Sequence, residues 1–289
     1  MANPSYTGTD THLKELARLI EANSYRHRRH EVFRDFCEIA ALSISNAVDR
    51  SQFDAREARY LEVVGRYERQ EVARFPQMLG CLVESLQAGL HDALGSLFMA
   101  MSLGDHWRGQ FFTPYEVALM MAKMTMHDAG RVIEQQGFIT LCEPAAGAGG
   151  MVLACANSLH DDKINYQRTM HATLVDVCPT AVHMAYVQLS LCHVPAIVLH
   201  GNALTLEEWG HWVTPAHVLG GWDYKLARRG FADAATTAPT PDPVPEVIAV
   251  PACLAPESLQ PISVPSIERQ RATVLASRIS TGNQLGLFD

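Results

Sequence analysis

Apolar residues recur at intervals of three and four positions over about the first hundred residues of the chain. This spacing places them on one face of a helix, so the pattern predicts a helical N-terminal domain over residues 1–105. The apolar positions are Leu13, Leu16, Leu19 and Ile20, then Val32, Phe33, Phe36, Ile39 and Ala40, and later Met78, Leu82, Leu86, Leu90 and Leu94.

The pattern changes from about residue 106. Three short runs of β-forming residues alternate there with helical stretches: FITLC at 138–142, ATLVDV at 172–177 and AIVLH at 196–200. Strands that alternate with helices form βαβ units around a parallel sheet. The sequence therefore predicts an α/β domain over residues 106–230.

Proline marks a further change after Gly230. Eight of the 15 prolines fall between residues 231 and 265, which is typical of a stiff, extended linker. We therefore predict a proline-rich linker over residues 231–280 and a short tail over residues 281–289.

Composition excludes several classes of protein. With 48% hydrophobic and 19% charged residues, the 289-residue chain is typical of a soluble globular protein. No apolar run approaches the roughly 20 residues of a membrane span, and the N-terminus shows no secretory signal, so we expect a cytoplasmic location. The net charge of −8 argues against a protein that coats nucleic acid by bulk electrostatics.

One short stretch departs from this acidic balance. YRHRRHEVFR carries Arg26, Arg28, Arg29 and Arg34 against a single carboxylate, that of Glu31. Such a stretch is typical of a solvated helix face, and the alternative is a local patch that contacts phosphates.

The cysteines and histidines show no metal-binding pattern. None of the seven cysteines forms a C-x-x-C pair, and none of the 13 histidines lies in an H-E-x-x-H motif. We therefore expect reduced thiols and no metal site.

The clearest candidate for a ligand site is the segment FITLCEPAAGAGGMVLACANSL at 138–159. Its pattern predicts a buried strand, the acidic Glu143, a glycine-rich turn and an apolar helix. Such a turn lets a ligand approach the backbone at the end of the strand, where the N–H groups of the helix face it. Val152 replaces the third glycine of G-x-G-x-x-G, which disfavours a dinucleotide site, and no P-loop Gly-Lys-Ser/Thr follows. A purely structural turn is the alternative.

Polar residues follow the next two strands as well. The second strand ends at Asp176 and the third at Asn202. Because successive strand ends of a parallel sheet line one crevice, we expect Glu143, Asp176 and Asn202 to converge there. An acidic residue at the second strand end is the expected partner of ribose hydroxyls.

A helix start precedes these strands in GQFFTPYEVALMMAKM. Thr113 has the position of an N-cap, Pro114 that of the first helical residue and Glu116 that of the third, which together predict a capping box. A well-capped core helix explains these three residues but leaves the preceding GQFF unexplained.

Taken in order, GQFFTP, EPAAGAGG, an acidic second strand end and GNAL resemble the N6-adenine DNA methyltransferases. The likeness is greatest to the modification subunit of type I restriction-modification systems and covers about residues 105–205. It implies a Rossmann-like S-adenosylmethionine-dependent methyltransferase domain preceded by a helical domain. It also implies S-adenosylmethionine as the cofactor, with DNA and a separate specificity subunit as partners.

The resemblance assigns cofactor-binding roles to four parts of the chain. Asp176 matches the ribose ligand, and Asn202 stands where many relatives have Asp near the adenine ring. The methionine part of the cofactor is matched by Phe111, Thr113 and Pro114, and the glycine-rich loop by Glu143, Pro144, Gly147 and Gly149.

The catalytic motif of that family is degenerate in this chain. The family carries Asn/Asp-Pro-Pro-Tyr/Phe after its fourth strand, where oxygen acceptors hold the target amino group and the aromatic ring stacks on a flipped-out base. The chain contains no Pro-Pro dipeptide. The candidate fourth strand, AHVLGGWDY at 216–224, places Gly221 at the amide position, Trp222 and Asp223 at the prolines and Tyr224 at the aromatic position. Since the linker begins where relatives have further strands, we expect a truncated sheet.

The tail bears a second resemblance. Gln284-Leu285-Gly286-Leu287-Phe288 is similar to the pentapeptide with which bacterial polymerases and repair proteins dock on the sliding clamp, usually Q-L-S/D-L-F. This implies the clamp as a partner, contacted by Gln284, Leu285, Leu287 and Phe288. Packing of the tail on the α/β domain is the alternative.

Three functions agree with these observations. The first is an adenine-N6 DNA methyltransferase, in which Tyr224 stacks on the base and Asp223 or Asn202 accepts the amino protons. The second is a non-catalytic relative that binds the cofactor, or only a partner, and reaches DNA through the clamp. The third is a small-molecule methyltransferase, since the glycine-rich loop does not identify the methyl acceptor.

Overall fold

The computed structural model describes residues 10–103 and 112–236, with side chains up to residue 229. Phe111, most of the predicted linker and the tail with Gln284, Leu285, Leu287 and Phe288 lie outside the described residues. The described residues up to Trp222 belong to one compact unit, and a second unit begins at Asp223.

The N-terminal region is helical, as its apolar spacing predicts. Its elements are α1 (Thr11–Asn23), α2 (Arg29–Val48), a single 3-10 turn (Arg50–Gln52), α3 (Phe53–Val64), α4 (Arg69–Val72), α5 (Arg74–Gln87) and α6 (Ala93–Ala100). Aspartates cap two of these α-helices at their N-termini. Asp10 accepts a hydrogen bond from the Leu13 N–H at 2.7 Å, and Asp92 accepts one from the Gly95 N–H at 2.8 Å.

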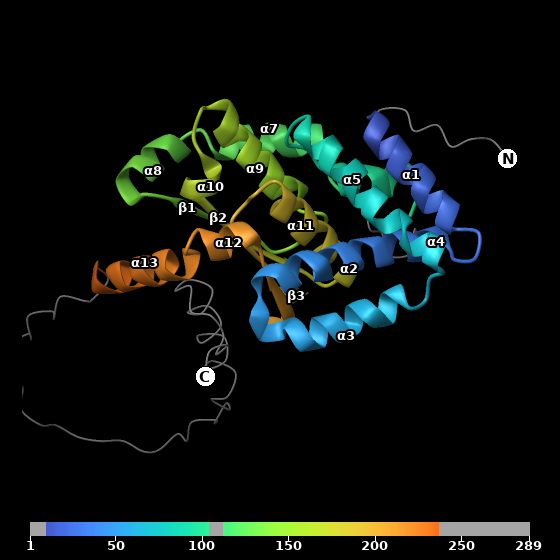
Figure 1. Ribbon diagram of the computed structural model, residues 1–289. Coiled ribbons are helices and arrows are strands. Elements are labelled where there is room, and N and C mark those ends of the chain that lie inside the picture. Colours follow the sequence, from blue (N-terminus) through green and yellow to red (C-terminus); the bar gives the residue numbers. More distant parts are fainter. Residues whose placement is uncertain (1–9, 104–111, 237–289) are drawn as a thin grey trace, which may run out of the picture. The chain divides into compact units, whose positions relative to one another are not determined.

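A four-stranded sheet follows, in the order β1-β2-β3-β4 (Figure 1). The strands β1 (Ile139–Glu143), β2 (Met170–Asp176) and β3 (Ala196–Asn202) are parallel, which confirms the three predicted strands and the α/β class. The strand β4 (Glu207–Val213) returns antiparallel to β3. Because β1, β2 and β3 run in one direction, they all end at the same edge of the sheet, which we call the carboxyl edge.

Helices connect and flank these strands. The helices α7 (Tyr115–Thr125) and α8 (Ala129–Gln136) precede β1, α9 (Gly150–Asp161) and α10 (Tyr166–Thr169) connect β1 to β2, and α11 (Pro179–Leu191) connects β2 to β3. The helices α12 (Pro215–Leu219) and α13 (Trp222–Thr236) follow β4. No helix within residues 10–103 or 112–236 is both long and apolar enough to cross a membrane.

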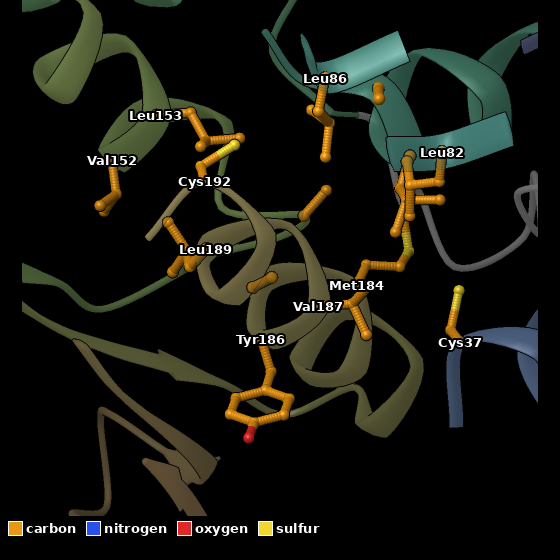
Figure 2. Packing of buried hydrophobic residues seen from close by; sticks show 14 of the residues in the cluster. Cys37, Leu82, Leu86, Val152, Leu153, Met184, Tyr186, Val187, Leu189 and Cys192 are labelled. Atoms are coloured by element: carbon orange, nitrogen blue, oxygen red, sulfur yellow. The ribbon is translucent and has the colours of Figure 1, made fainter. Parts of the chain in front are cut away.

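The helix α11 is the centre of the core. All of its residues from 181 to 190 are buried, so it has no solvent-facing stripe, as expected of a helix enclosed by other elements. Figure 2 shows the side chains around it, which come from α2 (Cys37), α5 (Leu82 and Leu86) and α9 (Val152 and Leu153). Since one cluster of buried side chains extends from α1 to β3, the helical region and the sheet share a single core.

The prediction of a strand over residues 216–224 is wrong. This segment forms α12 and the beginning of α13, and the fourth strand is β4, upstream of it. Thr214 and Pro215 provide the physical reason, because together they begin a helix. The Thr214 hydroxyl accepts a hydrogen bond from the His217 N–H, and Pro215 occupies the first turn, where its missing N–H costs nothing.

The helix α12 begins at the sheet edge opposite the carboxyl edge. Because β4 is antiparallel, its last residue, Val213, lies beside Ile197 near the start of β3. The next residue, Thr214, donates a hydrogen bond from its hydroxyl to the Val194 carbonyl at 2.8 Å. The segment after β4 therefore starts where the parallel strands begin, not where they end.

Two predicted boundaries also need correction. The helix α7 begins at Tyr115 and its N-cap position is Pro114, whose ψ of 136° is not helical, so Thr113 and Glu116 do not form the predicted capping box. The helix α13 continues to Thr236, so a helix occupies the first residues that were assigned to the linker.

Candidate functional site

A cavity of about 680 Å³ lies at the carboxyl edge of β1 and β2. Its volume falls in the usual range for small-molecule sites. The start of α9, the loop after β2 and the segment before α7 contribute its walls. The lining residues are Asp92, Phe112, Thr113, Met121, Glu143, Ala145, Ala146, Gly147, Ala148, Gly150, Met151, Asp176, Val177, Cys178 and Pro179.

The glycine-rich turn brings backbone close to this cavity. Gly147 has φ of +53° and Gly149 has φ of +85°, a region that L side chains rarely adopt. A Cβ at Gly147 would lie 2.8 Å from Cδ1 of Phe112, and a Cβ at Gly149 would lie 3.2 Å from Cβ of Ala185. Glycine is therefore required at both positions, by backbone conformation and by close packing.

Asp176 joins the ends of β1 and β2. Its Oδ2 accepts a hydrogen bond from the Gly147 N–H at 2.8 Å, and its Oδ1 accepts one from the Cys178 N–H at 2.8 Å. Each carboxylate oxygen keeps a lone pair for a further donor. Since Asp176 also lines the cavity, its carboxylate can accept hydrogen bonds from hydroxyl groups of a ligand there.

The helix α9 adds a positive partial charge. It begins at Gly150, which lines the cavity, and it has 12 residues. The N–H groups of its first turn have no carbonyl partner within the helix, so this end of α9 favours an anionic group of a ligand.

Four of the predicted cofactor residues meet in this cavity. Thr113, Glu143, Gly147 and Asp176 all line it. The others are placed differently: Pro144 and Gly149 belong to the turn without lining the cavity, Pro114 precedes α7, and Phe111 lies outside the described residues.

Asn202 does not join this group. Its Oδ1 accepts a hydrogen bond from the Leu204 N–H at 2.9 Å, which is the geometry of an Asx turn leading from β3 to β4. The predicted convergence of three strand ends therefore holds for Glu143 and Asp176, whereas Asn202 shapes the hairpin.

The structure does not bring Gly221 to the cavity either. Gly221 has φ of +60° and links α12 to α13, at the opposite edge of the sheet. The next residue, Trp222, is fully buried against Phe138 and His171, with ring centroids 5.1 and 5.2 Å away. Of the remaining catalytic candidates, Asp223 and Tyr224 lie in the first turn of α13, and the Tyr224 side chain is 71% exposed.

Phe112 and Asp92 are among the lining residues that sequence reasoning missed. Phe112 packs on Phe98 of α6 at 5.1 Å between ring centroids and lies over Gly147. It belongs to the GQFFTP motif, but the motif alone does not tell which of its two phenylalanines reaches the turn. Asp92 comes from the start of α6, and only its helix-capping position was visible in the sequence.

Asp92 belongs to a buried network centred on Gln188 of α11. The Gln188 Nε2 donates to Asp92 Oδ1 at 2.9 Å and to the Ala148 carbonyl at 2.8 Å, while its Oε1 accepts from the Leu94 N–H at 2.8 Å. Burial raises the pKa of the Asp92 carboxyl above its usual value, while the hydrogen bonds from Gln188 and Gly95 act in the other direction. The network joins α6, the glycine-rich turn and α11.

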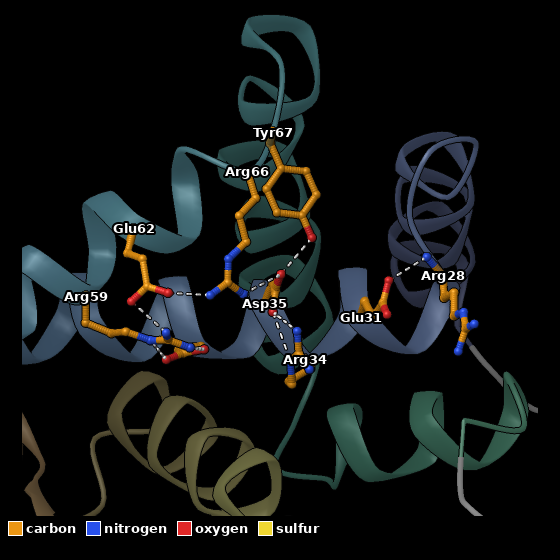
Figure 3. Close-up of polar contacts among 9 residues, drawn as sticks. Arg28, Glu31, Arg34, Asp35, Arg59, Glu62, Arg66 and Tyr67 are labelled. Carbon is orange, nitrogen blue, oxygen red and sulfur yellow. Dashed lines mark hydrogen bonds and ion pairs between the residues drawn. The ribbon is translucent and has the colours of Figure 1, made fainter.

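The arginine-rich stretch around α2 forms ion pairs of its own (Figure 3). Arg34 lies 2.8 Å from the buried Asp35 carboxylate, which also accepts a hydrogen bond from the Tyr67 hydroxyl at 3.0 Å. Arg26 pairs with Glu68. Two of the four arginines, Arg26 and Arg34, are therefore already paired with carboxylates. Within the described residues, no group of three or more His, Cys, Asp or Glu side chains could hold a metal ion.

A glycine-rich turn, a helix N-terminus and an acidic second strand end around one cavity are the parts of a nucleotide-type cofactor site. Residues 99–218 match the family described as N-6 DNA Methylase. The matched range includes Thr113, Glu143, Gly147 and Asp176 and ends before Gly221. No curated protein matches the chain.

One similar solved structure comes from Listeria monocytogenes and is provisionally described as a class I S-adenosylmethionine-dependent methyltransferase. The two chains are 16% identical, with a TM-score of 0.39, over 68% of this chain and 55% of that one. This chain therefore spans about half the length of the Listeria protein.

The Gln188 network predicts a large loss of stability when its centre is removed. Replacing Gln188 with Ala leaves the Asp92 carboxylate, the Ala148 carbonyl and the Leu94 N–H with unmet hydrogen bonds in the core. We expect the free energy of unfolding, measured by urea denaturation, to fall by about 2–4 kcal/mol. The matched control is Gln135→Ala on the exposed face of α8, which should change it by less than about 0.5 kcal/mol. Equal stability of the two variants would contradict the network.

Proposed function

We propose that this chain binds S-adenosylmethionine in the cavity at the carboxyl edge and is the cofactor-binding part of an N6-adenine DNA methylase. The observation that carries the proposal is the meeting of Thr113, Glu143, Gly147 and Asp176 around one cavity. The match of residues 99–218 to the N-6 DNA Methylase family supports it, since that range contains the same four residues.

The residues around the cavity fit this cofactor. Asp176 keeps lone pairs for the ribose hydroxyls, and the absence of a Cβ at Gly147 leaves room beside Phe112. The first turn of α9 suits the carboxylate of the methionine part, and Thr113 lines the same space. When bound, S-adenosylmethionine supplies an electrophilic methyl group on a sulfonium. The role of the chain is to hold that group in place.

The same geometry favours a non-catalytic relative over a complete methyltransferase. Gly221 has no side chain to accept the amino protons of adenine, and it lies at the edge of the sheet opposite the cavity. Asn202 uses its side-chain oxygen in the β3–β4 hairpin. We infer that the chain binds the cofactor and accompanies DNA, and that it transfers little or no methyl group to adenine by itself.

Cofactor binding can be tested by calorimetry on the full chain. We expect S-adenosylmethionine and S-adenosylhomocysteine to bind in the micromolar range and to raise the melting temperature through mass action. Gly147→Val should abolish both effects, because its side chain would overlap Phe112 and would strain a backbone with φ of +53°.

Gly137→Ala is the matched control for this test. Gly137 also has a positive φ, of +84°, but a Cβ there meets no atom within 4 Å. This variant carries the backbone strain alone and should bind the cofactor as the wild type does. Absence of heat from the wild type at millimolar cofactor would refute the binding proposal.

Methyl transfer can be measured with labelled S-adenosylmethionine and unmodified DNA. An electrostatic group that stabilises the transition state is typically worth about 10²–10³ in rate, so the purified chain should transfer methyl groups at a rate reduced at least about a hundredfold from that of an intact methylase. Robust incorporation that is lost in Tyr224→Ala or Asp223→Ala would overturn the non-catalytic assignment. Comparing DNA methylation in cells with and without the protein extends the test to partners that the purified chain lacks.

A second part of the proposal concerns recruitment. We infer from the sequence Gln284-Leu285-Gly286-Leu287-Phe288 that the chain docks on the bacterial sliding clamp. Leucine and aromatic anchors dominate the affinity of such peptides, so Leu287→Ala and Phe288→Ala should each weaken binding by about 2 kcal/mol or more, while Gly286→Ser should be tolerated. The measurement is surface binding to the clamp by the full chain and by a version ending at Gly282. Equal binding by both versions, or by neither, would refute clamp docking.

A further inference from the structure

Asp92 is a buried acid with one carboxylate oxygen in use and one free. Its side chain lines the cavity, yet the residue is only 4% exposed. Both hydrogen bonds that it accepts, from the Gly95 N–H and from Gln188 Nε2, end on Oδ1. Within the described part of the chain, no donor reaches Oδ2 and no cation pairs with the carboxylate.

Two glycines make room for this carboxylate. A Cβ at Gly95 would overlap it, and a Cβ at Gly150 would lie 3.0 Å from Oδ2. Oδ2 therefore lies over the start of α9, where Gly150 lines the cavity. The carboxylate therefore packs against the backbone at these two glycines, with Oδ2 beside the cavity.

Capping of α6 explains why Asp92 Oδ1 accepts a hydrogen bond, but it does not explain why the capping side chain is a carboxylate. Serine or asparagine caps a helix about as well as aspartate, and burying a carboxylate without a cation is costly. Burial raises the pKa of this carboxyl, because the charged form loses its hydration. A cationic group of a ligand in the cavity would compensate it.

Of the three acids that line the cavity, Asp176 and Asp92 lie at the two ends of the glycine-rich turn, and Glu143 ends β1 before it. The Asp176 carboxylate accepts a hydrogen bond from the Gly147 N–H, and the Asp92 carboxylate lies close to Gly150, three residues further along the chain. A ligand that spans the turn therefore meets one carboxylate at each end, with the positive end of α9 beside the second.

We propose that Asp92 Oδ2 accepts a hydrogen bond from the α-ammonium of the methionine part of S-adenosylmethionine. This proposal rests on the proposed function, since it assigns one group of the same ligand. The ammonium is chosen over the sulfonium because only the ammonium carries N–H donors for a carboxylate oxygen. The ligand carboxylate, next to the ammonium in the same molecule, then faces the N–H groups of α9.

The test compares three ligands on the full chain with Asp92→Asn. This substitution keeps the oxygen that caps the helix and the shape of the side chain, and it replaces the charged acceptor Oδ2 with an uncharged NH2 donor. S-adenosylmethionine has both cationic groups, S-adenosylhomocysteine has the ammonium alone, and 5′-methylthioadenosine has neither. We expect Asp92→Asn to weaken the first two by about tenfold or more and to leave 5′-methylthioadenosine within about twofold.

A matched control is Asp10→Asn, which makes the same change at the N-cap of α1. It should leave all three affinities unchanged. If Asp92→Asn does not fold, Asp92→Ser, which also retains a capping oxygen, replaces it in the same comparison.

Each outcome decides between the roles of Asp92. Unchanged affinity for S-adenosylhomocysteine, or a loss confined to S-adenosylmethionine, would overturn the ammonium assignment. An equal loss of affinity for 5′-methylthioadenosine would show that Asp92 only shapes the cavity. That result would also overturn the ammonium assignment. Failure of the wild type to bind any of the three ligands would instead refute the proposed function.

Discussion

The side-chain amide of Gln188 joins the three parts of the molecule that enclose the cavity. It bonds to Asp92 and Leu94 at the start of α6 and to Ala148 in the glycine-rich turn, from a position in the middle of the core helix α11. All of these groups are buried, and in a medium of low dielectric each hydrogen bond is strong and each missing one is costly. Gln188 thus connects the glycine-rich turn to the start of α6, and both of these segments line the cavity.

The N-terminal helical region therefore contributes directly to the cavity. Phe98 of α6 packs on Phe112, which in turn lies over Gly147. Asp92, from the same helix start, lines the cavity beside Gly150. The core is continuous from α1 to β3, so the helices and the sheet fold as one unit around α11. A ligand in the cavity would therefore contact both regions and stabilise them together.

The parallel and antiparallel strands of the sheet lead to opposite ends of the strands. The ends of β1 and β2 bring Glu143, Asp176 and the glycine-rich turn to one cavity. In the described part of the chain, β1 pairs with β2 alone, and its Thr140 and Cys142 side chains are exposed. The strand β1 is thus the outer strand of the described sheet, and it is exposed on one face, whereas parallel strands are ordinarily covered on both faces. The same strand carries the glycine-rich turn. The strand that follows β3 is antiparallel and leads away from the carboxyl edge.

The sequence by itself determined the elements whose signals are local. Apolar spacing marked the N-terminal helices and the three parallel strands, and the glycines and acids at the strand ends marked Glu143, Gly147 and Asp176 as neighbours. Only the tertiary structure decided which other side chains join them. Asp92 and Gln188 are 96 residues apart, and no periodicity connects positions so distant in the chain. The place of Gly221 was decided in the same way, because the Thr214-Pro215 helix start and the antiparallel return of β4 direct that segment to the opposite edge of the sheet. A hydrogen bond between distant segments depends on how the core packs, whereas a turn or a cap depends on a few adjacent residues.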